Sequence, residues 1–203
     1  MKVLVVYCHP SANSFTHAVK EAFVRGALDA GHAVEVSDLY GMNFNPVMSE
    51  EEYLREGFYD NSRPVPDDVL REQDRLDRAE AIAFIYPVFW TEAPALLAGW
   101  FQRVWTYGFA YGDIPAMKPL QKALFLITMG GSLTEEIRVQ QLEAMKTVML
   151  GDRINWRAAT SEMIAFDEMT RGYGNDGRRA ENSAKFLRQA YQAGQEIASG
   201  RAE

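Results

Sequence analysis

The polar segment from His9 to Thr16 follows a short apolar run and has the side chains of a phosphate-binding loop. Ser14 and Thr16 lie where the next helix is expected to begin, and the free N–H groups and positive dipole end of a helix start attract anions. The segment contains neither GxGxxG nor GxxxxGK, which disfavours a Rossmann dinucleotide turn and an ATPase phosphate loop. Phosphate binding and simple helix capping by Ser14 both remain open, and capping is the commoner role.

A second unusual segment, residues 87–94, has large aromatic residues between two prolines at the end of another apolar run. It lacks the Gly, Asn, Asp and Ser of ordinary turns. A stiff aromatic loop offers a flat apolar wall and backbone N–H donors, which is what the ring of a flavin needs. The residues expected to contact such a ring are Pro87, Val88, Phe89, Trp90 and Thr91. Taken alone, Trp90 could equally be a core residue or a dimer contact.

The third segment, residues 128–132, contains the adjacent glycines Gly130 and Gly131. Paired glycines permit positive φ and allow a ligand to approach the backbone closely, although a plain turn explains the pair as well. Like the other two segments, this one follows a buried run. We therefore expect Thr128, Met129, Gly130 and Gly131 to bind the same cofactor.

Apolar runs and helical periodicity predict the elements that position these segments. Strands are expected at 2–7, 33–37, 81–86, 123–128 and 163–166, and helices at 14–30, 67–78, 96–105, 134–149 and 177–198. This alternation predicts one doubly wound α/β domain, residues 1–203, with five parallel strands. The three segments should then meet at the carboxyl edge of the sheet, where ligands of such folds bind. Residues 39–66 lack periodicity and are expected to form a long loop.

Composition excludes several classes of function. The 203 residues carry a net charge of −7 without a long basic run, so nucleic acid is not an expected partner. No apolar stretch is long enough to span a membrane, and Cys8, the one cysteine, excludes an internal disulfide. No signal peptide is evident, so the cytoplasm is the expected location. No metal site is expected, since His17 and His32 form no ligand motif, and no GxSxG indicates a serine hydrolase.

Three motifs carry a resemblance to a known family. They are SDLYGMNFNP at 37–46, YPVFWTEAPALLAGWFQRVWTYGFAY at 86–111 and TMGGS at 128–132. Together they closely resemble the FAD-dependent NAD(P)H:quinone oxidoreductases, or DT-diaphorases. The resemblance implies a flavodoxin-like fold with strand order 2-1-3-4-5 and a homodimer. It also implies a reaction in which NAD(P)H reduces the flavin and a quinone or similar small acceptor then takes the electrons from the same pocket.

The resemblance also implies roles for individual residues. His9, Phe15 and Thr16 are similar to the family's pyrophosphate contacts, residues 88–91 to its isoalloxazine loop, and residues 128–131 to its second flavin loop. Tyr111 resembles the family's substrate-facing tyrosine, contributed across the dimer interface, and Phe109 is expected beside it. The Tyr and His that follow the Gly-Gly loop in mammalian members are missing from residues 133–155. No catalytic residue is therefore assigned.

The aromatic residues that follow the third strand predict how the chain assembles. Their apolar ring surface is larger than one helix needs to cover a sheet, so part of this surface is expected to be shared between two subunits across a two-fold axis. The residues are Trp100, Phe101, Val104, Trp105, Tyr107, Phe109 and Tyr111. A shared open pocket would give ping-pong kinetics. FMN in place of FAD, an electron-carrier flavodoxin and a regulatory subunit of a membrane transporter remain alternatives, and the preference between NADH and NADPH is open.

Overall fold

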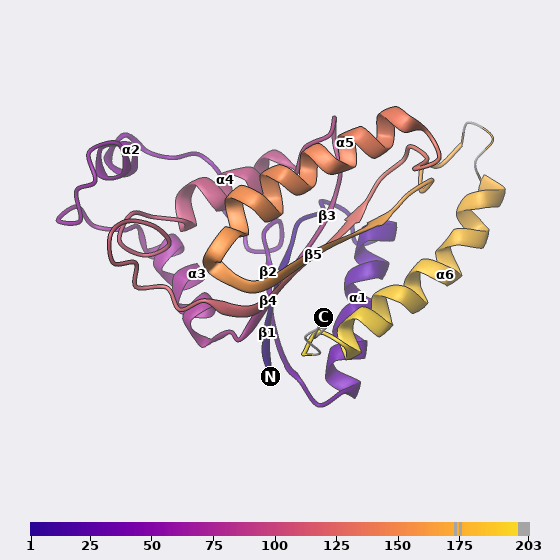
Figure 1. The fold of residues 1–203 in the computed structure, drawn as a ribbon, viewed down its shortest axis with the longest axis horizontal. Helices are drawn as coiled ribbons and strands as arrows, with labels where there is room; N and C mark the ends of the chain where they lie inside the picture. Colours follow the sequence, from indigo (N-terminus) through magenta and orange to yellow (C-terminus); the bar gives the residue numbers. More distant parts are fainter. Residues whose placement is uncertain (173, 175, 199–203) are drawn as a thin grey trace.

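A five-stranded parallel sheet forms the centre of the protein, whose structure is a computed structural model describing residues 1–172, 174 and 176–198 (Figure 1). The strands are β1 (Lys2–Tyr7), β2 (Ala33–Asp38), β3 (Ala81–Pro87), β4 (Leu120–Thr128) and β5 (Ala158–Phe166). Their order is β2-β1-β3-β4-β5, and every neighbouring pair is parallel. The predicted flavodoxin-like topology is therefore confirmed.

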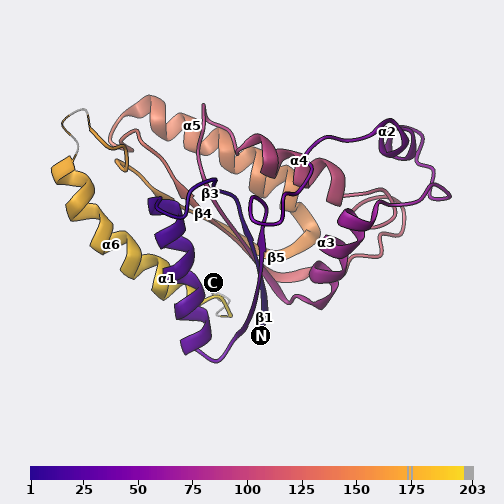
Figure 2. The same cartoon turned by 180° about the vertical axis from the view of Figure 1, so that it is seen from behind.

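Helices cover both faces of this sheet (Figure 2). The α-helices are α1 (Phe15–Asp29), α2 (Glu50–Gly57), α3 (Asp67–Arg78), α4 (Ala95–Val104), α5 (Glu136–Lys146) and α6 (Asp176–Gln195). Helices α1 and α6 pack against each other on one face, while α3, α4 and α5 cover the other. None of the helices in the described residues is both long and apolar enough to cross a membrane.

The central strands are apolar on both sides because each side of the sheet is covered. Along β1, Val3 and Val5 enter the core beneath α1 and α6, whereas Leu4 and Val6 enter the core beneath α3 and α4. Every residue of β3 is buried. A strand that buries alternate residues in two different cores reads as a continuous apolar run, which is why the sequence predicted these strands closely.

Helix α2 lies inside the segment 39–66, where a long loop was predicted, and projects from the body of the molecule (Figure 1). Ser49 begins the helix with a capping box, since it accepts the N–H of Glu52 while the Glu52 carboxylate accepts the N–H of Ser49. The helix residues that are buried are Glu52 and Arg55. An apolar periodicity search misses such a helix because charged residues face the protein.

The chain after α5 also differs from the prediction. The helix predicted over 134–149 continues from α5 as a π-helix, Thr147–Ile154, and then as a short 3-10 helix, Asn155–Arg157. Strand β5 begins at Ala158. The predicted start at Met163 was too late, because residues 159–162 are exposed and form no apolar run. Both differences lie where the local sequence has little apolar patterning.

The aromatic residues of α4 lie in the chain's own core. Trp100 is fully buried, Phe101 and Trp105 pack against it, and Phe84 of β3 contacts both Trp100 and Phe101. Val104 is buried with them, and Phe109 is buried as well. These five predicted side chains are covered within a single chain, whereas Tyr107 and Tyr111 are only half-buried. The sharing of part of the aromatic surface between two subunits stays a prediction.

Candidate functional site

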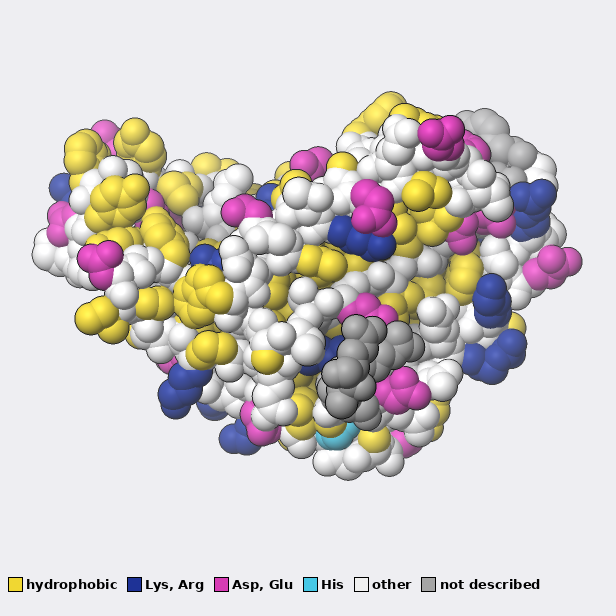
Figure 3. Space-filling view, in the orientation of Figure 1, with side chains coloured by type: hydrophobic (Ala, Val, Ile, Leu, Met, Phe, Trp, Pro, Cys, Tyr) yellow, Lys and Arg dark blue, Asp and Glu magenta, His cyan; other side chains and the backbone are white. Residues whose placement is uncertain are grey.

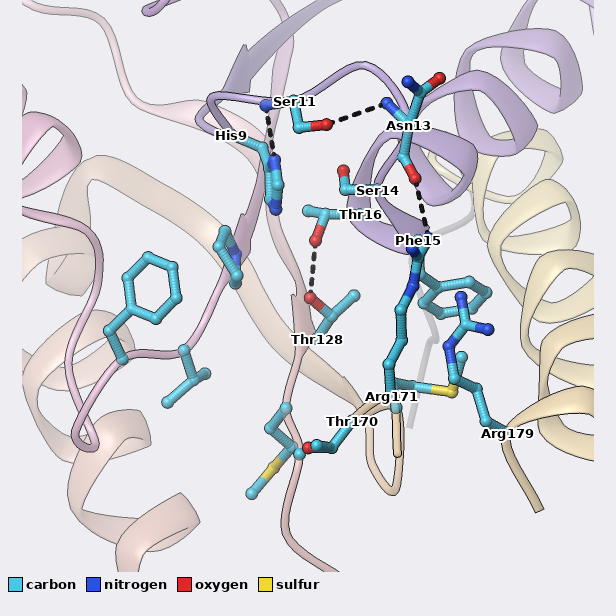
Figure 4. Close-up of a pocket in the computed structure, with 16 residues that line it drawn as sticks. His9, Ser11, Asn13, Ser14, Phe15, Thr16, Thr128, Thr170, Arg171 and Arg179 are labelled. Atoms are coloured by element: carbon cyan, nitrogen blue, oxygen red, sulfur yellow. Dashed lines mark hydrogen bonds between the residues drawn. The ribbon is translucent and has the colours of Figure 1, made fainter. Parts of the chain in front are cut away.

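The three segments singled out from the sequence meet at the carboxyl edge of the sheet and line one cavity of about 540 Å³ (Figure 4). The predicted residues that line it are His9, Ser14, Phe15, Thr16, Pro87, Val88, Phe89, Thr128, Met129 and Gly130. Trp90, Thr91 and Gly131 do not line it. A single hydrogen bond of 2.8 Å between the hydroxyls of Thr16 and Thr128 joins the first and third segments.

The first segment gives the cavity a helix start. Ser14 caps α1 by accepting the N–H of His17 at 3.0 Å, so the capping role of this residue is present. No acidic side chain occupies the first turn of α1, which leaves its positive end available to an anion from outside the helix. His9 accepts the N–H of Ser11 through Nδ1 at 2.9 Å, and burial lowers the pKa of this imidazole from its usual value.

The second segment forms a tight turn from Phe89 to Glu92. The two residues exchange backbone hydrogen bonds of 2.9 Å, and both central residues have positive φ, 51° for Trp90 and 64° for Thr91. Such a turn is built most easily from Asn and Gly, so these two side chains occupy a strained conformation. The turn leaves Trp90 100% exposed. Pro87, Val88 and Phe89 form the apolar wall of the cavity instead.

The third segment uses its glycines for close packing. Neither Gly130 nor Gly131 has a positive φ, so the left-handed conformation that paired glycines permit is not used here. A Cβ on Gly130 would lie 2.0 Å from Oγ1 of Thr170, and one on Gly131 would lie 2.6 Å from Nε of Arg138. At Gly130 the packed Thr170 therefore leaves no room for a side chain, whereas at Gly131 the flexible Arg138 side chain could move aside.

A fourth segment, after β5, completes the cavity and was missed by the sequence analysis. Met169, Thr170 and Arg171 line it, together with Arg179 near the start of α6. Arg171 donates from Nη2 to the carbonyl oxygen of Asn13 at 3.2 Å, and the buried Nε of Arg179 has no hydrogen-bond partner among the described residues. Applying the carboxyl-edge rule to β5 as well as to β1, β3 and β4 would have indicated this segment.

The predicted acceptor residues lie apart from this cavity. Phe109 is buried, and Tyr111 lies beside α2, where its hydroxyl donates to Glu56 at 2.7 Å. Burial, reinforced by that carboxylate, raises the pKa of Tyr111 far above its usual range. Neither side chain lines the cavity of its own chain.

Cys8 offers no reactive thiol. Burial at the end of β1 raises the pKa of its thiol to about 12. A thiol with so high a pKa stays protonated at neutral pH and is a poor nucleophile. Among the described residues, no group of three or more His, Cys, Asp or Glu side chains is arranged to hold a metal ion.

The sheet order and the cavity at its carboxyl edge define a doubly wound α/β protein of the flavodoxin-like class. A family model described as "Flavodoxin-like fold" matches residues 1–151. The chain belongs to this family.

Comparison with known proteins agrees with the resemblance carried by the three motifs. The chain is 38% identical over 149 residues to NAD(P)H dehydrogenase (quinone) 1 of Rattus norvegicus, covering 64% of this chain and 54% of that protein. It is 34% identical over 149 residues to ribosyldihydronicotinamide dehydrogenase (quinone) of the same organism, covering 64% of each. The chain thus spans between about half and two thirds of these curated relatives.

A solved structure extends the similarity over nearly the whole chain. It is the NAD(P)H:quinone oxidoreductase from Methanothermobacter marburgensis, with a TM-score of 0.91 and 38% identity. The match covers 99% of this chain and 98% of that one.

Proposed function

We propose that this chain is a flavin-dependent NAD(P)H oxidoreductase that reduces quinones or related small acceptors. The observation that carries the proposal is the cavity at the carboxyl edge, which joins a helix start and two arginines to an apolar wall. A flavin has the matching parts, since its phosphate is anionic and its ring is flat and apolar. The similarity to quinone oxidoreductases supports the same function.

The residues around the cavity fit a flavin nucleotide. The start of α1, with Ser14 and Thr16, would hold a phosphate. Arg171, which donates to the carbonyl oxygen of Asn13 beside that helix start, and Arg179 would supply cations to the same group. The resemblance to FAD-dependent quinone oxidoreductases, and a cavity that offers a helix start and two arginines to a pyrophosphate, favour FAD, with FMN as the alternative. The buried Nε of Arg179, which has no partner in the described part of the chain, is available to such a group.

Val88, Phe89 and Met129 would flank the ring with their side chains. Their backbone N–H groups already donate within the chain, to the carbonyl oxygens of Thr128, Glu92 and Phe166. A bound flavin would accept a hydride from NAD(P)H and pass two electrons to the acceptor. The chain's own contribution is to bind and orient the ring and to exclude water from one of its faces. Because NAD(P)H and the acceptor would use the same open face in turn, we expect ping-pong kinetics.

A homodimer is part of the proposal. The exposed apolar side chains of the segment around α2 support it, since Val47, Tyr53, Phe58 and Tyr59 are 61–70% exposed. Figure 3 shows hydrophobic side chains gathered over the region where Figure 1 places α2. Exposed apolar clusters of this kind mark protein interfaces. In such a dimer, Tyr111 of one protomer would line the cavity of its partner. The cytoplasmic location stays a prediction.

The cofactor released from purified protein tests the proposal directly. We expect a yellow protein with about one non-covalent flavin per chain, FAD by mass spectrometry, and NAD(P)H oxidation that depends on added quinone. Tyr111→Ala should raise the apparent KM for quinone while leaving flavin content nearly unchanged. A colourless protein that gains no flavin on reconstitution would refute the proposal, and an active monomer in light scattering would refute its shared pocket.

A further inference from the structure

Glu56, at the carboxyl end of α2, accepts hydrogen bonds from residues 107 and 111 of the segment that follows α4. Its Oε2 accepts the Tyr111 hydroxyl at 2.7 Å and the backbone N–H of Tyr107 at 2.8 Å. Its Oε1 accepts Nη1 of Arg55 at 2.7 Å. Both carboxylate oxygens of Glu56 therefore accept hydrogen bonds, and a carboxylate can act only as an acceptor.

The surroundings hold the Tyr111 hydroxyl in this one orientation. Arg55 donates from Nη2 to the carbonyl oxygen of Tyr107 at 3.0 Å, and the N–H of Gly108 donates to the carbonyl oxygen of Tyr111 at 2.8 Å. The ring of Tyr107 packs between those of Tyr59 and Tyr111, with centroid separations of 5.1 and 5.7 Å. Arg55 and Glu56 are largely buried, so this arrangement is shielded from water. Moving the hydroxyl would break a charge-assisted hydrogen bond, which is about twice as strong as a neutral one.

The direction of this hydrogen bond has a chemical consequence. A tyrosine hydroxyl has one hydrogen, and Glu56 accepts it, so only oxygen lone pairs remain for other partners. A small molecule that meets Tyr111 therefore finds a hydrogen-bond acceptor. A bare carbonyl oxygen gains nothing from this hydroxyl, whereas an N–H or O–H group does.

We propose that Glu56 turns Tyr111 into a hydrogen-bond acceptor and so selects electron acceptors that carry an N–H or O–H donor beside the quinone carbonyl. The inference rests on the proposed function, in which Tyr111 lines the acceptor pocket. Glu56 is a positioning residue in this scheme, since it acts on the small molecule only through Tyr111.

A matched pair of quinones tests the selection. A monomethylamino-naphthoquinone and its dimethylamino analogue differ by one N–H, and Tyr111→Phe sets the baseline for their other differences. The measured quantity is kcat/KM for the monomethylamino quinone divided by kcat/KM for the dimethylamino quinone. In the intact protein this ratio should exceed its value in Tyr111→Phe by about two- to tenfold, the effect of one neutral hydrogen bond. Glu56→Ala should return the ratio to the baseline or below it. A ratio that is the same in the intact protein and in Tyr111→Phe would overturn the proposal.

The ionisation of Tyr111 tests the contact without any turnover. Tyrosine labelled with carbon-13 at Cζ reports the pKa of each phenol by NMR, and Tyr111→Phe assigns the signal. The charged and titratable groups that face this phenol are Glu56, Arg55 and Tyr59. Glu56→Gln should lower the pKa of Tyr111 toward its usual value of about 10, because a neighbouring negative charge is removed.

A control on the same helix is Glu50→Gln, which removes an exposed charge from the first turn of α2 and should leave the Tyr111 titration unchanged. An equal pKa for Tyr111 in the intact protein and in Glu56→Gln would overturn the proposal. If no variant reduces any quinone, the proposed function fails. The titration would then still show whether Glu56 controls the hydroxyl of Tyr111.

Discussion

Replacement of Trp90 by Ala tests whether this side chain contacts the cofactor, because a cofactor contact changes flavin affinity whereas a structural role changes the free energy of unfolding. The indole is 100% exposed, so truncating it removes no buried area within the chain. The positive φ at this position penalises Ala and Trp alike. We therefore expect the free energy of unfolding of the flavin-free protein to change by less than about 0.5 kcal/mol.

The expected effect on flavin binding is much larger. Covering about half of an indole, roughly 100 Å², contributes about 2.5 kcal/mol to binding. This corresponds to about a sixtyfold change in Kd, and a loss of about tenfold is the smallest that the reasoning allows. The energy becomes available only if Trp90 leaves solvent when the ring is bound.

Two titrations of the flavin-free protein measure these quantities: urea unfolding, and quenching of flavin fluorescence on binding. Trp156→Ala is the matched control, because this tryptophan is also exposed but lies outside the segment 87–94 that is proposed to contact the ring. Unchanged flavin affinity in Trp90→Ala would show that the ring does not contact Trp90. If dimerisation weakened in that variant instead, the indole would belong to the interface between protomers.

Gly130→Val should weaken flavin binding at least tenfold in the same fluorescence assay, because its Cβ would lie 2.0 Å from Oγ1 of Thr170 and its methyl groups would enter the cavity. Full flavin content in this variant would exclude that loop from the site. Arg103→Met should cost about 3–5 kcal/mol in urea unfolding, because this guanidinium, 4% exposed, is the ion-pair partner of two carboxylates; a loss below about 1 kcal/mol would contradict the argument. Hydrogen bonds from Arg103 hold the pKa of Asp68 below its usual value of about 3.9. The ionised Asp68 therefore contributes its full stabilisation above about pH 3.9, and this contribution is lost as the pH falls through the lowered pKa of the folded protein. Asp68→Asn should therefore be less sensitive than the intact protein to a change from pH 6 to pH 3, and equal sensitivity would contradict the assignment.

The apolar pattern of the sequence is enough to predict the sheet and the edge at which the site lies. Strand β3 and the residues of β1 after Lys2 bury side chains on both faces, so they form unbroken apolar runs, and this signal is local. The carboxyl-edge rule then predicts that His9, Phe89 and Thr128 lie together. All three residues line the cavity.

Features that depend on partners distant in the sequence become visible only in the folded chain. Helix α2 faces the protein with charged residues, and it is held by Arg103, 51 positions from its partner Glu52. The need for glycine at position 130 comes from Thr170, which arrives from a different strand end. The turn geometry at Trp90 directs its indole into solvent. Apolar periodicity records which face of an element is buried, but ion pairs, close backbone approaches and the direction of a turn side chain arise only when distant segments meet.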